Sequence, residues 1–129
     1  MTNLLHITEP SEIPKILELI HDCWLDASMI VLDSEKSTLS IRYLKGIGST
    51  SSFVSRIRFP AIECFLRISR VESFSVQDKQ KVRFYDINSL AYDPMSRCVQ
   101  LRTGVPIEIR AIVADFDITV EETSTVVQR

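Results

Sequence analysis

The sequence has little of several residue types that build well-known functional sites. Its 129 residues include two histidines, three glycines and three cysteines. Two of the glycines fall in Gly46-Ile47-Gly48-Ser49-Thr50, which lacks the Gly-Lys-Ser/Thr ending and the following helix pattern of a phosphate-binding loop. We therefore expect residues 45–52 to form a loop rather than a nucleotide site.

The three cysteines, Cys23, Cys64 and Cys98, are widely spaced and form no CxxC pair. This spacing is typical of free thiols in a reducing compartment, so we expect a cytoplasmic protein. No histidine is placed to act as a base for any of them. They are therefore predicted to be small core residues rather than catalytic nucleophiles.

Long apolar runs and an excess of one charge are also lacking. No apolar run approaches the ~20 residues of a membrane helix, and the N-terminus does not have the pattern of a signal peptide. The net charge is −2, from 15 basic and 17 acidic residues, which favours neither nucleic acid nor an anionic membrane as a partner. With 45% apolar and 25% charged residues, the composition predicts one ordinary globular domain over residues 1–129.

The clearest periodic pattern lies near the N-terminus and predicts an amphipathic helix. Ser11 is the expected N-cap, and Pro14 is tolerated in a first turn. Trp24 is expected to end the apolar stripe as a core anchor. The stripe consists of Ile13, Ile16, Leu17, Ile20 and Trp24.

The rest of the chain alternates as strands do. Met29–Leu32 and Leu39–Tyr43, joined by the polar residues Asp33–Lys36, predict a hairpin. Further strand patterns cover 53–59, 62–68, 82–92, 98–102 and 105–120, the last with a kink near Ala114-Asp115, and the tail 121–129 is expected to fray. The prediction is an α+β fold, with one N-terminal helix packed on a mostly antiparallel sheet of six or seven strands. The sheet is either open or folded over into a sandwich. No internal repeat is apparent.

His21 and Asp22 form the most suggestive pair for chemistry. In metal phosphohydrolases an adjacent His-Asp supplies two ligands to one divalent cation, and Glu18 and Asp26 could add oxygen ligands. Such sites also need histidines from other helices, and the only other histidine here is His6. The alternative is that His21 and Asp22 simply end the helix. We favour the helix end, and we assign no catalytic residue, metal or cofactor.

One part of the sequence resembles a known group of proteins. It comprises His21-Asp22-Cys23-Trp24-Leu25-Asp26, Ile30-Val31-Leu32-Asp33 and Lys36-Ser37-Thr38-Leu39-Ser40-Ile41. This pattern resembles the N-terminal segment of small uncharacterised bacterial proteins, some of which are grouped with immunity proteins of polymorphic toxin systems. The resemblance spans about residues 13–44. It implies a cytoplasmic binding protein without catalytic activity.

Three functional hypotheses follow. The first is a non-enzymatic interaction module that binds a protein partner or a second copy of itself, for instance as a homodimer, through an unpaired edge or an apolar patch. The second is a small metal-dependent hydrolase that uses His21 and Asp22 with Glu18 or Asp26. The third is a small-ligand carrier with a closed apolar cavity between helix and sheet.

Overall fold

The computed structural model describes residues 3–46, 60–78, 81–104 and 107–128. The loop and strand expected between 47 and 59 lie outside these residues. The α+β class is confirmed, with one short helix and one large antiparallel sheet that does not close. The strands are β1 (Asn3–Ile7), β2 (Trp24–Asp33), β3 (Thr38–Gly46), β4 (Pro60–Ile68), β5 (Val71–Asp78), β6 (Phe84–Asp93), β7 (Cys98–Thr103), β8 (Ile107–Val113) and β9 (Ile118–Gln128).

The helix is shorter than the sequence predicts. A 3₁₀ turn, η1 (Pro10–Glu12), leads into α1 (Ile13–Ile20), and neither start has a side-chain cap, so the prediction that Ser11 caps the helix is wrong. The helix ends at Ile20 because Asp22 adopts a φ of 65° and its N–H bonds the carbonyl of Ile87 on β6. Trp24 therefore opens β2 instead of ending the helix. It is half-buried and packs over Gly46.

The described sheet has nine strands in the order β1-β9-β4-β3-β2-β6-β7-β8-β5. The prediction of six or seven is therefore too low. The sequence patterns did not clearly identify β1 or β5, and they treated 105–120 as one strand, which the structure divides into β8 and β9. The predicted kink near Ala114-Asp115 is confirmed, because β8 ends and β9 begins on either side of it. The tail does not fray at 121, because β9 stays paired with β4 up to Gln128.

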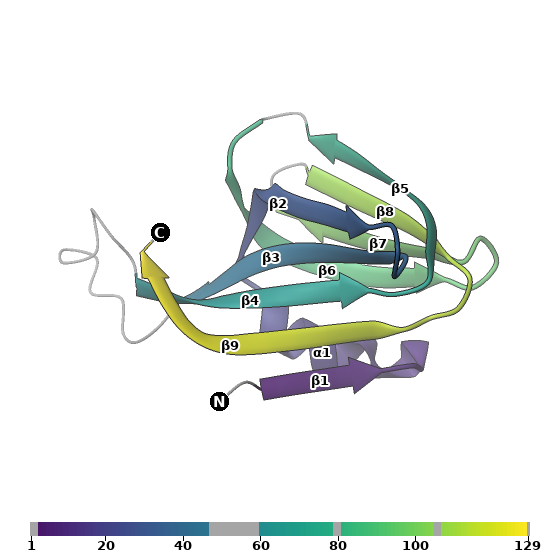
Figure 1. The fold of residues 1–129 in the computed structure, drawn as a ribbon, viewed down its shortest axis with the longest axis horizontal. Coiled ribbons are helices and arrows are strands. Elements are labelled where there is room, and N and C mark those ends of the chain that lie inside the picture. Colours follow the sequence, from purple (N-terminus) through teal and green to yellow (C-terminus); the bar gives the residue numbers. More distant parts are fainter. Residues whose placement is uncertain (1–2, 47–59, 79–80, 105–106, 129) are drawn as a thin grey trace.

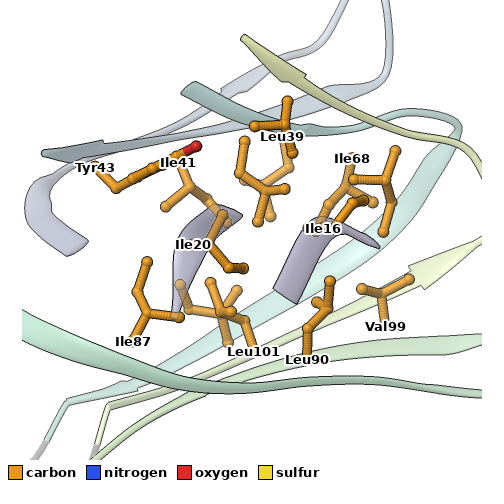
Figure 2. Close-up of a cluster of buried hydrophobic side chains, with 14 of the residues drawn as sticks. Ile16, Ile20, Leu39, Ile41, Tyr43, Ile68, Ile87, Leu90, Val99 and Leu101 are labelled. Atoms are coloured by element: carbon orange, nitrogen blue, oxygen red, sulfur yellow. The ribbon is translucent and has the colours of Figure 1, made fainter. Parts of the chain in front are cut away.

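The sheet bends into two layers around the helix (Figure 1). One layer holds β1, β9, β4, β3 and β2, and the other holds β6, β7, β8 and β5. Ile16 and Ile20 of α1 are fully buried between them. Figure 2 shows these two side chains with residues of one layer on one side (Leu39, Ile41, Tyr43) and residues of the other layer opposite (Ile87, Leu90, Val99, Leu101). No helix in the described parts of the chain is long and apolar enough to cross a membrane.

Two continuous stretches of chain pass from one layer to the other. β4 runs into β5 through Ser69-Arg70, where Arg70 has a φ of 56°, and β8 runs into β9 through residues 114–117. β4 pairs with β9 and β5 pairs with β8. The two bent strands thus form one long ribbon that joins the layers at a corner.

The strand pairings reveal an internal two-fold relationship that the sequence does not show. In the β2–β3 hairpin Ile30 pairs with Ile41, and sixty positions further on Leu90 pairs with Leu101 in the β6–β7 hairpin. Each hairpin is followed by a bent strand, β4–β5 or β8–β9. The two halves meet where β2 pairs with β6, symmetrically about the pair of Leu25 and Tyr85.

The bent strands obey the same relationship. On β9, Ile118 and Val120 pair with Ile68 and Leu66 of β4. On β5, Phe74 and Val76 pair with Ala111 and Ile109 of β8. Phe74 and Val76 thus occupy the positions in their half that Ile118 and Val120 occupy in the other. The segment β1–α1 belongs to neither half and has no counterpart among the described residues.

Candidate functional site

The segment β1–α1 covers one side of the molecule and leaves the symmetry-related side uncovered. β1 pairs along the outer edge of β9, and α1 packs against β6. By the two-fold relationship, the outer edge of β5 corresponds to the edge of β9 that β1 covers. The end of β2 that runs to Asp33 corresponds to the part of β6 that α1 covers. Within the described residues, β5 pairs only with β8, and Ile30–Asp33 of β2 pair only with β3. Both edges thus end the hydrogen-bonded sheet.

The side chains of β5 are more exposed than those at the symmetry-related positions of β9. Phe74 and Val76 share a sheet face with buried partners on β8, so they point toward the core side of the layer. Each is nevertheless 38% exposed, whereas Ile118 and Val120 are 0% and 1% exposed. The side-chain types are similar, so the difference comes from the cover that β1 and α1 provide.

The far half of β2, Ile30–Asp33, is also more exposed than the related part of β6. Leu32 pairs with the buried Leu39 and is 38% exposed, whereas its counterpart Tyr92 is half-buried and packs edge-on against Phe116, with 5.0 Å between ring centroids. Met29 and Val31, on the other face of the strand, are also exposed. This part of β2 carries no proline and no charged residue before Asp33, and therefore lacks the usual protection of an edge strand.

The two uncovered edges approach each other at one end. The N–H of Val71, at the start of β5, donates to the carbonyl of Ser37, the last residue of the β2–β3 turn, over 2.8 Å. Leu32, Phe74 and Val76 therefore belong to one side of the molecule. We call these three residues, together with Ile30, the uncovered face.

The residues proposed as metal ligands do not come together as a site. His21 and Asp22 are exposed and contact each other, with 3.2 Å between Nδ1 and Oδ2. Glu18 is exposed on α1, and Asp26 is fully buried on β2. Among the described residues no group of three or more histidine, cysteine, aspartate or glutamate side chains is placed to hold a metal ion. His21 is the C-cap of α1, as the helix-end interpretation predicts.

Asp26 instead sits in a cluster of opposite charges. Its carboxylate accepts hydrogen bonds from Arg42 Nη1 at 2.7 Å, from Arg83 Nε at 3.2 Å and from the Ser28 hydroxyl at 2.6 Å. Arg42 also donates through Nε to Glu63 at 2.7 Å. Burial acts to raise the pKa of Asp26, but the hydrogen bonds from Arg83, Ser28 and Arg42 outweigh it, and the pKa is lowered. The carboxylate is thus saturated with donors, and we interpret the cluster as structural.

Cys23 and Cys64 are buried core residues, as predicted, and Cys98 is half-buried. Burial raises the pKa of Cys23 to about 11 and that of Cys64 to about 12, so both thiols stay protonated and unreactive at neutral pH. Cys64 pairs across the sheet with Tyr43. The buried Tyr43 hydroxyl has no hydrogen-bond partner in the described structure. Cys23, Cys64 and Tyr43 therefore offer no activated nucleophile.

Four surface hollows among the described residues open to solvent. The hollow closest to the carrier hypothesis lies beside α1, between β1 and β9, with a volume of about 240 Å³, and it opens to solvent. It is lined by Asn3, Leu4, Leu5, Leu19, Val120 and Glu122. It is not the closed apolar cavity that a carrier of this kind requires.

Comparisons with known proteins found no relative of this chain. No family model matches it, and neither the curated proteins nor the solved structures contain a significant match.

Sequence reasoning missed the uncovered face because each of its residues looks like an ordinary strand residue. Phe74 and Val76 alternate with serines, which is a typical half-buried pattern. A signal was present in the edge itself, since Met29–Leu32 is apolar and uncharged. The strand order is needed to see that β1 and α1 cover one side of the molecule and leave the related side uncovered.

Proposed function

We propose that this protein is a non-enzymatic interaction module that binds another polypeptide through the uncovered face. The observation that carries the proposal is the exposure of Phe74 and Val76, whose symmetry-related counterparts on β9 are buried beside β1. Leu32 is likewise exposed, whereas its counterpart Tyr92 is half-buried. Apolar side chains at an unpaired sheet edge are where a second chain gains both apolar burial and backbone hydrogen bonds.

The remainder of the molecule supports this function over catalysis. The carboxylate of Asp26 is occupied by arginines, the buried thiols have raised pKa values, and His21 and Asp22 form an exposed helix end. The segment of about residues 13–44 that resembles small uncharacterised bacterial proteins, some of them grouped with immunity proteins, includes the far half of β2, and binding a partner protein is what that resemblance implies. We place the protein in this functional class as a proposal.

The test compares two leucine-to-lysine variants of the full chain in its own host. Leu32→Lys places a charge on the uncovered face, and Leu4→Lys makes the same change at an exposed leucine of β1, on the opposite edge of the sheet. Native mass spectrometry of the purified proteins reports any co-purified polypeptide or second copy. We expect a complex for the wild type and for Leu4→Lys, and its loss in Leu32→Lys, because a lysine at the interface must be desolvated.

Circular dichroism and urea unfolding confirm that both variants fold. A wild-type protein that is monomeric and free of any bound polypeptide, or a complex that survives Leu32→Lys, contradicts the proposal.

A further inference from the structure

The apolar residues along the free edge of β2 lie on both faces of the strand. Ile30 and Leu32 point to the core side, where they pair with the buried Ile41 and Leu39. Met29 and Val31 point outward and are 41% and 53% exposed. A helix packed on one face would bury only half of these side chains, whereas a strand paired in the plane of the sheet lies beside both faces. The exposure along this edge therefore indicates an added strand as its cover.

The free part of the edge begins beyond Ala27. The N–H of Ala27 donates to the carbonyl of Arg83 over 2.7 Å, so the chain that leads into β6 already fills the place opposite Ala27. Within the described residues, β2 pairs with β6 only at residues 24–26, and Ile30–Asp33 pair only with β3. The segment Met29–Asp33 is thus open to an added strand.

This segment is complementary to itself in an antiparallel pair. With a two-fold axis at Val31, Val31 lies opposite Val31 of the other copy, and Ile30 lies opposite Leu32. Residues that lie opposite each other share a sheet face. The outward valines therefore meet on one face, and two isoleucine–leucine pairs form on the core side.

The neighbouring registers fit less well. An axis at Ile30 would set Asp33 opposite Ala27, where Arg83 already lies. An axis at Leu32 would set the carboxylate of Asp33 opposite Val31 and would leave Met29 without a partner. The axis at Val31 is therefore the one that uses the whole free segment.

The charges of the segment do not oppose this pairing. Asp33 is the only charged residue between positions 29 and 33, and it comes opposite Met29 of the other copy, so no like charges face each other. Its Oδ1 accepts the N–H groups of Glu35 and Lys36 at 3.1 and 3.3 Å, which holds the carboxylate in the β2–β3 turn. The segment also lacks the lysine and proline with which edge strands usually prevent pairing with a second copy.

We propose that the partner is a second copy of this chain, and that two molecules pair antiparallel through Met29–Asp33 of β2 about a two-fold axis at Val31. This inference rests on the proposed function and names its partner. The same patch is used by both copies, so the contact closes after two molecules and does not continue into a fibre. A standard interface has about 20–30 residues a side, so this dimer is expected to be weak and to dissociate on dilution.

The test uses the fact that residue 31 faces itself across the axis. Val31→Lys and Val31→Asp each set like charges opposite one another, whereas an equimolar mixture of the two variants sets a lysine opposite an aspartate. Sedimentation equilibrium of the full-length proteins over a range of concentrations gives the dissociation constants. We expect each variant alone to dimerise at least about tenfold more weakly than the wild type, and the mixture at least about tenfold more tightly than either variant alone.

The matched control is Val126→Lys, which makes the same change at a valine of β9 that is 57% exposed. We expect it to change the dissociation constant by less than about threefold. Urea unfolding shows that the variants fold. Amide hydrogen exchange of Met29–Asp33 in the wild type should slow as the concentration rises, which tests the interface without any substitution.

A wild type that stays monomeric at every concentration overturns the inference. A dimer that tolerates Val31→Lys, that forms without protection of Met29–Asp33, or whose variants associate no better when mixed overturns it too, because Val31 then does not face itself. If a complex with a different polypeptide in the host depends on Leu32 while the pure protein is monomeric, the proposed function stands and this inference falls. If there is no complex either, both fall.

Discussion

At the residue scale, Asp26 is the charged side chain that the described structure buries completely. It lies on β2 next to the junction with β6, and its side chain is fully buried. Two guanidinium groups and the Ser28 hydroxyl and N–H surround it. A buried carboxylate is tolerated only with such compensation, because an unpaired charge in the interior costs several kcal/mol. The cluster therefore fixes the position where the two halves of the sheet meet.

This arrangement predicts a specific dependence of stability on pH. The folded pKa of Asp26 is lowered, so the unfolded chain binds the proton more readily and the stabilisation is fully present above the unfolded value of about 3.9. It is lost as the pH falls through the folded pKa. Asp26→Asn should lower the free energy of unfolding by about 3 kcal/mol at pH 7.

Urea unfolding at several pH values measures this effect. The difference between wild type and Asp26→Asn should shrink as the pH drops below about 4. A difference that stays constant down to acid pH would show that the carboxylate charge is not what the arginines stabilise.

At the element scale, the end of α1 depends on one unusual backbone conformation. Asp22 has a φ of 65°, in the left-handed region, and this turns the chain from the helix into β2. Left-handed backbone costs a residue with a Cβ about 1 kcal/mol, and aspartate tolerates it better than most residues do. Asp22 also lies at the negative end of the helix, which is unfavourable for its charge. The turn therefore needs the conformation of Asp22 more than its carboxylate.

Asp22→Gly should accordingly raise the free energy of unfolding by up to about 1 kcal/mol, because glycine adopts positive φ freely. Asp22→Ala, which removes the same carboxylate but keeps a Cβ, should lower it by about 1 kcal/mol. Thermal unfolding distinguishes the two. If both variants lose stability equally, the carboxylate itself matters, and a role in chemistry for the His21-Asp22 pair must be reconsidered.

At the scale of the whole molecule, one added segment makes two related halves unequal. The halves share strand order and register, yet only one is completed by β1 and α1. The core cluster accordingly includes Leu90, Ile118 and Val120, whereas Leu32, Phe74 and Val76 stay exposed. Regions with less apolar burial open more easily.

Native-state hydrogen exchange should reveal this inequality in the free protein. The amides of β5 are expected to exchange faster than those at the matching positions of β9, and those of Ile30–Leu32 faster than those of Leu90–Tyr92. Mass spectrometry after digestion, or NMR, can follow the four segments in one experiment. Equal protection in both halves would mean that β1 and α1 contribute no local stability.

Much of the fold could be predicted from local patterns, and the limits have physical causes. Alternation along Ile62–Ile68 and the break before Val71 correctly predicted β4 and its end, because side chains in a strand alternate between faces. Trp24 was misplaced because its spacing also fits a helix, and only the pairing of Asp22 with Ile87 ends α1 earlier. The uncovered face could not be predicted, since exposure at Phe74 depends on which strands lie beside it.

The pairing of β1 with β9 also has a mechanical consequence. The start of β1 and the far end of β9 lie at the same end of an antiparallel pair, with Asn3 opposite Glu122. A tensile force that pulls the start of β1 away from the far end of β9 would load the hydrogen bonds between these two strands one after another, beginning at Asn3. Detachment of β1 would expose Ile118 and Val120. Under tension, the covered edge would thus become a second edge like that of β5.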